Sequence, residues 1–314
     1  MVMTSASSIV AAYALDTAIG DPENYPHPVR MMGKLIGFIE GKASPLVEKA
    51  FLGKLAGTAA ATVVVGSAYL APKVLLALPG RRATEIILVY TTISRKDLAR
   101  CALRVARALE RDDILQARAG LAALVGRDTA GLDECAVARA AVESVAENLV
   151  DGVLSPLQWV AVGGAPAAVA FKAVSTLDSM IGHRGREHLN IGWFSAKLDD
   201  LVNFLAARAS VPLTAAASFL CGLDGKAAMS IGMRDRLKHE SPNSAHAEAA
   251  FAGALGLRLG GPSWYGGEVR ELPEIGEGTR HAGPDHIRAA VRLMNVVSAI
   301  GLSVSTAFAR KGVR

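Results

Sequence analysis

The sequence predicts an all-α, polytopic membrane protein in which amphipathic helices and loops form an interfacial active site. Of its 314 residues, 51% are apolar and only 20% are charged, and the mean hydropathy is +0.30. Long uncharged runs occur along the chain. No segment shows the sustained alternation of apolar and polar residues that is typical of a strand, so little sheet is expected. We therefore expect a single helical membrane domain over residues 1–314.

Four uncharged runs are candidate membrane segments, because a spanning helix needs about 20 apolar residues. They cover residues 55–72 (extending past Lys73 to Leu78), 152–171, 209–223 and 293–309. Gly163-Gly164-Ala165-Pro166 is predicted to break the second run into a re-entrant hairpin, and Pro212 to break the run at 201–223. The competing interpretation is an alanine-rich soluble protein whose core helices imitate spans.

A water-facing helical layer is expected at about residues 91–148. Apolar Leu98, Ala102, Val105 and Leu109 recur at helical spacing, with arginines on the other face. Residues 114–125 and 132–145 repeat this pattern, with glycine turns between them. A polar loop region is expected at about 224–292, and within it residues 260–284 are predicted to form an irregular loop.

Charge and cysteine content exclude several classes of protein. The net charge of +5 comes without a Lys- or Arg-rich block or interleaved aromatic residues, so nucleic acid is not expected as a partner, whereas membrane lipid is. Three cysteines without metal-ligand spacing favour a reducing compartment. The apolar start, residues 1–15, has no basic residue, so it is expected to belong to the mature fold rather than to a cleaved signal.

An acidic stripe is the most informative local pattern. Glu143, Glu147 and Asp151 are spaced four residues apart, so on a helix they line one face. Three such carboxylates repel one another unless a cation lies among them. That cation is a metal ion, a substrate amine, or Lys and Arg side chains from elsewhere in the chain.

Two further polar segments follow apolar runs. Three prolines fix the segment 21–30 and hold Asp21 and His27, although a plain loop between helices explains it equally. The segment 172–182 contains Lys172, Asp178 and Ser179. Alternatively, Lys172 has no role in a site and only extends from the apolar run to the membrane surface.

Two clusters have the chemistry of metal and phosphate sites. Asp199 and Asp200 are adjacent carboxylates that suit a hydrated cation, or else one of them is a partner of the helix dipole. The basic segment 234–244, together with the glycine-rich segment 260–267, has the donors that hold phosphate oxygens, unless it is a solvated turn. We expect all these clusters to converge on one pocket, which requires an even number of membrane crossings between them, or none.

Seven segments, in this order between Gly20 and Gly267, resemble the adenosylcobinamide-phosphate synthase family of corrinoid biosynthesis, the CbiB/CobD-type membrane proteins. They are GDPENYPHPVRMMG, VGRDT, ESVAENLVDGVLSPL, KAVSTLDSMIGHR, GWFSAKLDDLVNFLAAR, RDRLKHESPNS and GALGLRLGGPSWYGG. The chain departs from the family pattern at Leu149-Val150, Phe171 and Ala245-His246, so the roles of neighbouring residues stay open.

The resemblance implies ATP-dependent amide formation between adenosylcobyric acid and (R)-1-amino-2-propanol or its O-phosphate, with ATP and Mg²⁺ as cofactors. ATP would activate the acid as an acyl phosphate, and a carboxylate base would free the amine. The expected location is the cell membrane, multi-pass, with the site facing the cytoplasm. A homo-oligomer and a complex with other corrinoid-pathway enzymes are both open. The alternative function is a non-catalytic corrinoid-binding or transport membrane protein.

Residue chemistry gives the following assignments. Glu147, Asp151, Lys172 and Asp178 are the candidate catalytic residues, and Asp199 and Asp200 are the candidate metal ligands. The candidate substrate- and phosphate-binding residues are Asp21, His27, Arg127, Asn148, Ser179, Arg234, Asp235, Lys238, Ser241, Asn243 and Tyr265.

Overall fold

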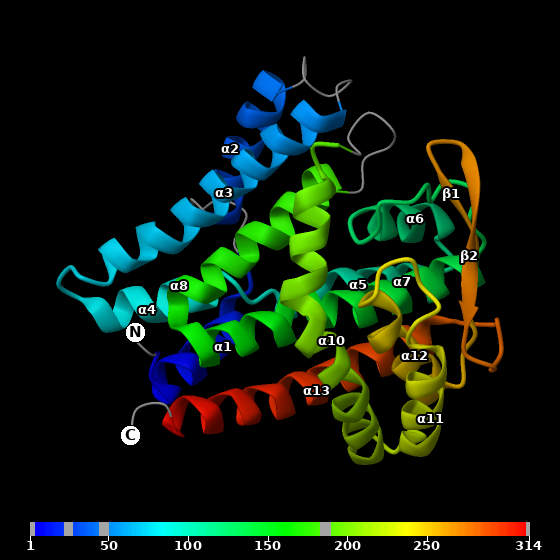
Figure 1. Ribbon diagram of the computed structural model, residues 1–314. Coiled ribbons are helices and arrows are strands. Elements are labelled where there is room, and N and C mark those ends of the chain that lie inside the picture. The colour runs from blue at the N-terminus through cyan, green and yellow to red at the C-terminus, as the bar shows by residue number, and fades with distance from the viewer. Residues whose placement is uncertain (1–3, 22–27, 44–49, 183–189, 312–314) are drawn as a thin grey trace. The chain divides into compact units, whose positions relative to one another are not determined.

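The computed structural model describes residues 4–21, 28–43, 50–182 and 190–311 (Figure 1). Helices dominate it, which confirms the all-α membrane fold class. The chain divides into two compact units. The first unit comprises residues 1–94, 155–203 and 302–314, and the second comprises 95–154 and 204–301. The prediction of a single domain stays a prediction.

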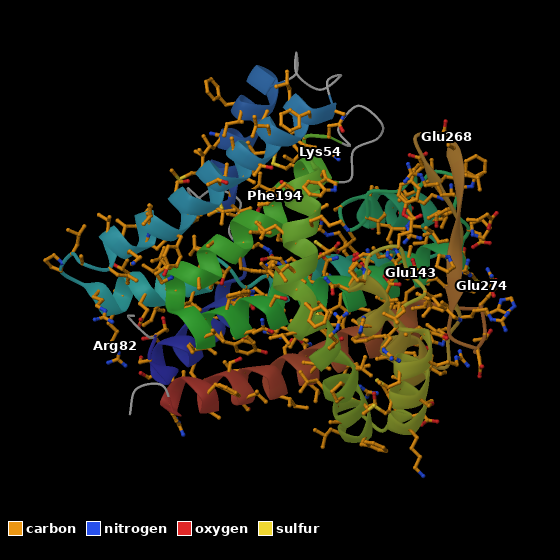
Figure 2. The ribbon with its side chains drawn as sticks, in the orientation of Figure 1. Lys54, Arg82, Glu143, Phe194, Glu268 and Glu274 are labelled. Atoms are coloured by element: carbon orange, nitrogen blue, oxygen red, sulfur yellow. The ribbon has the colours of Figure 1, made fainter. Side chains whose placement is uncertain are left out.

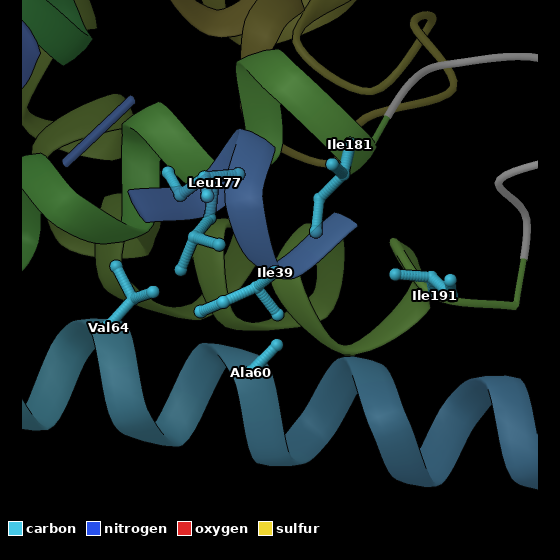
Figure 3. Close-up of a pocket in the computed structure, with 7 residues that line it drawn as sticks. Ile39, Ala60, Val64, Leu177, Ile181 and Ile191 are labelled. Atoms are coloured by element: carbon cyan, nitrogen blue, oxygen red, sulfur yellow. The ribbon is translucent and has the colours of Figure 1, made fainter. Parts of the chain in front are cut away.

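The first unit is a group of apolar helices. Helix α3 packs against α8, α1 against α4, and α2 against both α3 and α8. Aliphatic side chains of α2, α3 and α8 and of the segments beside them line a small apolar pocket, so the interior of this unit suits carbon rather than charge (Figure 3). Its elements are α1 (Ala6–Ile19), α2 (Pro28–Ala43), α3 (Ala50–Leu75), α4 (Arg81–Tyr90), α8 (Ser155–Leu177), the π-helical turn Asp178–Gly182, the start of α10 (Trp193–Leu220) and the end of α13 (Pro284–Lys311).

The second unit combines helices with one β-hairpin. Helix α7 packs against α5, α6, α12 and β1, and α12 also packs against α11 and β2. Aspartate N-caps define several helix starts; for example, Asp133 accepts a hydrogen bond of 2.7 Å from the Ala136 amide at the start of α7. The elements are α5 (Arg95–Leu109), α6 (Ile114–Ala122), α7 (Glu134–Leu149), the π-helical turn Val150–Leu154, the rest of α10, α11 (Gly225–Asp235), α12 (Ser244–Leu255), β1 (Leu259–Tyr265), β2 (Glu268–Ile275) and most of α13.

The amphipathic pattern at residues 98–109 is confirmed. Leu98, Ala102, Val105 and Leu109 are all buried on α5. The helix therefore forms because one apolar face packs against α6 and α7 while Arg100, Arg104 and Arg107 are exposed.

Three helical segments of the described chain are long and apolar enough to cross a membrane: Ala50–Leu75, Glu134–Gly182 and Pro284–Arg310. They contain the predicted runs 55–72, 152–171 and 293–309. On α3, Phe51, Leu55, Val63 and Leu70 are exposed, as lipid-facing side chains would be. The fourth run, 209–223, lies mostly in α10, which is not among these segments.

The two predicted helix breaks have different outcomes. Gly164 has a φ of +73°, which interrupts α8, and the freed amide of Ala165 donates a hydrogen bond of 2.9 Å to the Thr4 hydroxyl. The predicted break at Pro212 is wrong, because α10 continues through it. Val211 and Ala215, before and after the proline in the sequence, are buried, and burial of this face of α10 offsets the backbone hydrogen bond that proline removes.

The predicted irregular loop at 260–284 is also wrong, since most of it is an antiparallel hairpin. Tyr265 pairs with Glu268 across the two-residue turn Gly266-Gly267, in which both glycines have positive φ. Two such residues give the tight turn whose twist matches the strands. A Gly-Gly pair between two short runs is a hairpin signal even where the strands beside it lack sustained alternation.

Candidate functional site

A buried ion pair lies at the contact of α7 with β1. Arg127 Nη2 is 2.6 Å from Glu143 Oε2, and these side chains are only 15% and 8% exposed. The Gly260 amide donates to the other carboxylate oxygen at 2.7 Å, and Arg127 Nη1 donates to Ser263 Oγ at 3.1 Å. Figure 2 labels Glu143 on α7 and Glu268 and Glu274 on the hairpin, all three in the second unit. Glu143 is therefore held in place by two different donors.

Gly260 reaches Glu143 because of a β-bulge. The strand register shifts between Leu259 and Gly261, and Gly260 has a φ of +75°. A Cβ at this position would come within 2.1 Å of the Pro273 carbonyl oxygen. Only glycine therefore fits here without displacing the amide that binds Glu143.

The loop before α7 is tied to the hairpin. The Asp128 amide donates to the Trp264 carbonyl at 2.8 Å, and the Gly267 amide donates to Asp128 Oδ2 at 2.8 Å. Asp128 and Trp264, with Gly131 and Leu132, line an open cavity of about 300 Å³. These contacts fix the position of Arg127.

Two more glutamates complete what we call the carboxylate cluster, which consists of Glu143, Glu147, Glu248 and Arg127. Glu147 lies one turn beyond Glu143 on α7, is exposed, and accepts a hydrogen bond of 3.1 Å from Ser244 Oγ. Glu248, one turn along α12 from Ser244, is only 8% exposed. Its carboxyl group has no hydrogen bond within the described part of the chain.

Glu248 is electrostatically unusual. Burial is the main cause that raises its pKa well above the ordinary value, and the negative charges of Glu147 and Glu143 add to the increase. Arg127 opposes it only in part. Glu248 was not predicted from the sequence; the available signal was a lone glutamate in the alanine-rich, otherwise apolar segment 247–255.

A second group, the basic cluster, lies at the start of α12 and comprises Arg208, Arg236, Asn243 and His246. Arg208 Nη1 donates to Asn243 Oδ1 at 3.0 Å, and its guanidinium carbon lies 3.3 Å from the centre of the Phe204 ring. Burial and the nearby Arg236 lower the pKa of Arg208. Positive charge therefore accumulates here beside the positive end of a helix dipole.

The pKa of His246 is affected by the same excess of positive charge. Its ring is 1% exposed, and its Nδ1 has no hydrogen-bond partner among the described residues. Burial, Arg208 and Arg236 lower its pKa to about 4, so the ring is neutral at neutral pH. Arg208, Arg236 and His246 were not selected from the sequence.

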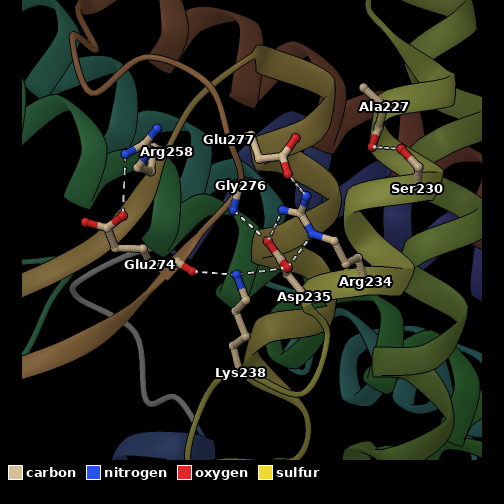
Figure 4. A network of polar contacts seen from close by, with 9 residues as sticks. All are labelled: Ala227, Ser230, Arg234, Asp235, Lys238, Arg258, Glu274, Gly276 and Glu277. Carbon is tan, nitrogen blue, oxygen red and sulfur yellow. Dashed lines mark hydrogen bonds and ion pairs between the residues drawn. The ribbon is translucent and has the colours of Figure 1, made fainter.

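The predicted phosphate binders Arg234, Asp235 and Lys238 form a different arrangement, the Asp235 network (Figure 4). Asp235 is fully buried and accepts hydrogen bonds from Arg234 Nε at 2.8 Å, Arg234 Nη2 at 2.7 Å and the Gly276 amide at 2.9 Å. Lys238 Nζ lies 2.9 Å from Asp235 Oδ1 and donates to the Glu274 carbonyl at 3.0 Å.

These contacts compensate the buried charge of Asp235. Burial alone would raise the pKa of Asp235, but the hydrogen bonds from Arg234, the Gly276 amide and Lys238 lower it well below its usual value. Arg234 also pairs with Glu277. The network thus joins α11 to the segment after β2, and a phosphate role for its cations stays a prediction.

The other predicted residues of the second unit lie around these clusters. Asn148 Nδ2 donates to the Ser144 carbonyl at 2.9 Å and to its hydroxyl at 3.1 Å. Asp151 lies in the π-helical turn after α7, so it does not continue the α-helical spacing of Glu143 and Glu147. Tyr265 ends β1 with Arg270 over its ring, and Ser241 Oγ accepts a hydrogen bond of 3.3 Å from the Asn243 amide.

The first unit contains the remaining described candidates. Asp178 and Ser179 open its π-helical turn, and a Cβ on Gly182 would come within 2.0 Å of Asp178 Oδ1, so Gly182 leaves room for that carboxylate. Lys172 lies one and a half turns earlier on α8. Asp199 Oδ2 accepts a hydrogen bond of 3.0 Å from Asn203, and Asp200 Oδ2 lies 3.6 Å from Lys197 Nζ. Asp21 follows α1.

Several predictions stay untested. His27 lies outside the described residues. Because the candidates divide between two units, their convergence on one pocket stays a prediction. Within the described ranges, no group of three or more His, Cys, Asp or Glu side chains is arranged to hold a metal ion. The carboxylate cluster is therefore not preformed as a metal centre.

Comparison with known proteins gives a consistent result. The CobD/Cbib protein family model matches residues 9–294. The chain is 42% identical to "Cobalamin biosynthesis protein CbiB" of Salmonella choleraesuis over 93% of this chain and 94% of that protein. It is 43% identical to "Cobalamin biosynthesis protein CobD" of Pelobacter propionicus, over 100% of this chain and 98% of that one. No solved structure shows significant similarity. The chain therefore belongs to the CobD/CbiB family.

Proposed function

We propose that this protein catalyses ATP-dependent amide-bond formation between adenosylcobyric acid and (R)-1-amino-2-propanol or its O-phosphate. A role in cobalamin biosynthesis at a membrane follows from the family and from the apolar helices. We further propose that the membrane is the cytoplasmic one and that the site faces the cytoplasm, where ATP is available.

The observation that carries the proposal is a pair of opposite, uncompensated charges at the start of α12. Asn243 is bound by Arg208 of the basic cluster, and the next residue, Ser244, binds Glu147 of the carboxylate cluster. A short amine phosphate has an ammonium group at one end and a phosphate at the other. Adjacent anionic and cationic clusters on one helix end suit this molecule, so the geometry favours the phosphorylated amine.

The chemistry of amide formation requires a base at the amine end. An ammonium group has no free electron pair, so it must lose a proton before nitrogen can attack an activated carboxyl carbon. A positioned carboxylate that accepts this proton contributes about 10²- to 10⁴-fold in rate. Glu147 is exposed and oriented by Ser244, so it can bind the incoming ammonium group from which such a base removes the proton.

The residues of α10 fit the Mg²⁺-nucleotide that this reaction needs. Asp199 and Asp200 offer adjacent carboxylates, and Asn203 orients Asp199 by a hydrogen bond of 3.0 Å. Two carboxylates suffice for Mg²⁺, which keeps water and phosphate oxygens in its other positions. When bound, the nucleotide would supply activation of the corrinoid carboxyl group.

The test is direct product analysis. Purified full-length protein in detergent is incubated with adenosylcobyric acid, ATP, Mg²⁺ and either amine form, and the products are weighed by mass spectrometry. We expect the amide product, with higher kcat/KM for the phosphorylated amine. Corrinoid binding without product from either amine would instead favour the non-catalytic binding or transport function.

A further inference from the structure

The carboxylate cluster carries more negative charge than its surroundings compensate. Glu143 is neutralised by Arg127 and the Gly260 amide. Among the described residues, Glu147 has only the neutral Ser244 hydroxyl as a hydrogen-bond partner, and Glu248 has none. A buried carboxyl group without a donor is destabilising unless it keeps a proton or gains a cation.

The neighbours of Glu248 explain why the protein itself does not supply that cation. Helix α12 packs against α7, α11 and β2. The charged groups that act on Glu248 are Glu147 and Glu143 from α7 and Arg127 from the preceding loop. Arg127 is engaged with Glu143 and Ser263. The cluster is thus anionic, closed on the Glu248 side and open to solvent at Glu147.

We propose that Glu248, together with Glu147, binds the ammonium group of the amine substrate and that Glu248 accepts its proton. This inference rests on the proposed amide-forming activity and adds a catalytic residue to it. An organic ammonium is favoured over a metal ion because the described carboxylates do not form a metal-binding group. A three-donor ammonium also suits carboxylates contributed by two facing helices.

The proton transfer balances within the site. One N–H bond of the ammonium breaks, its proton bonds to a carboxylate oxygen of Glu248, and the electron pair remains on nitrogen. The high proton affinity of a buried carboxylate beside other acids makes Glu248 a stronger base than an exposed glutamate. In the free protein the same property keeps a proton on Glu248, so ammonium binding must release it.

Isothermal titration calorimetry in two buffers of different ionisation enthalpy tests whether Glu248 binds the ammonium group and releases its proton. The ligands are 1-amino-2-propanol O-phosphate and isopropyl phosphate, which lacks the amine. Wild type is expected to release protons when it binds the amine phosphate. It should bind this ligand about tenfold or more tightly than isopropyl phosphate. Below the pKa of Glu248, this ratio of affinities should rise by up to about tenfold per pH unit. Glu248→Gln should lose the preference and the proton release.

The control is Glu268→Gln at the exposed hairpin turn, which removes one charge and should behave as wild type. Unchanged preference and proton release in Glu248→Gln would overturn the inference. If that variant does not fold, absence of proton release in wild type overturns it equally. Displacement of the amine by Mg²⁺ alone would assign the cluster to a metal instead.

Product analysis separates this inference from the proposed function. If calorimetry gives the expected proton release but no amide product forms, the ammonium site is supported and the ligase activity is rejected. Product formation with full activity in Glu248→Gln leaves the ligase and removes the role of Glu248.

Discussion

Two buried carboxyl groups of the second unit, Asp235 and Glu248, lie in opposite environments. Asp235 receives hydrogen bonds from Arg234 and the Gly276 amide and pairs with Lys238, and its pKa is lowered. Glu248 faces two other glutamates and its pKa is raised. The first arrangement satisfies its charge inside the protein and joins two segments. The second leaves a buried carboxyl group without a donor, and the proposed ammonium site rests on this difference.

The largest expected effect is on the open side of the carboxylate cluster. Glu147→Gln keeps the shape of the side chain and removes the negative charge beside Ser244. We expect kcat for amide formation to fall about 10²- to 10⁴-fold, because an ammonium group that Glu147 no longer holds beside Glu248 loses the benefit of positioned proton transfer. Steady-state product formation measures this, with Glu268→Gln as the control. Equal loss in both variants would contradict a local role.

The next effect concerns the structural network. Asp235→Asn removes the charge that Arg234 and Lys238 share, and we expect a loss of about 1–3 kcal/mol in the free energy of unfolding. The effect is modest because both cations are 42% exposed and regain water. Because the folded pKa is lowered, this stabilisation is present above the unfolded pKa of about 4 and is lost as pH falls toward the folded value.

Urea unfolding of the purified protein checks this prediction. Glu277→Gln is the matched control, because Glu277 pairs with the same Arg234 but is 70% exposed, so it should cost less than about 1 kcal/mol. A larger loss in Glu277→Gln than in Asp235→Asn would place the network's stability in the exposed pair.

An effect of similar size sharpens how the carboxylate cluster is positioned. Gly260→Ala combines an unfavourable φ with a contact to the Pro273 carbonyl, and should cost about 1–3 kcal/mol while displacing the amide that binds Glu143. Gly266→Ala is the control, since it also has positive φ but open space around it. Thermal unfolding midpoints compare the two. Equal shifts would mean that the contact with Pro273 does not matter.

The sequence was sufficient for features that depend on repeated apolar spacing. The buried face of α5 and three of the four apolar runs followed from periodicity and length. The hairpin was missed because β1 contains two glycines and a proline and neither strand alternates clearly. The break predicted at Pro212 was wrong because the burial of one face of α10 outweighs the local tendency of proline to end a helix.

The candidate site was predictable only where several polar residues lie close in sequence. Glu143 and Glu147 were visible as a stripe, and Asn243 as part of a basic segment. Glu248 was not, because an isolated acid in an alanine-rich helix becomes informative only when α7 brings other acids to it. The sequence did not reveal that Arg234 and Lys238 both pair with buried Asp235, and their phosphate role stays a prediction.

The most direct test of the account is the stability of wild type and Glu248→Gln from pH 5 to 8, with and without 1-amino-2-propanol O-phosphate. Because the folded pKa of Glu248 is raised, its contribution to stability is present below the unfolded pKa of about 4.3 and is lost as pH rises through the folded value. We predict that the wild-type unfolding midpoint falls relative to Glu248→Gln as pH rises, and that the amine removes this difference. The account would be contradicted if the unfolding midpoints of wild type and Glu248→Gln changed in parallel with pH and the amine raised both equally.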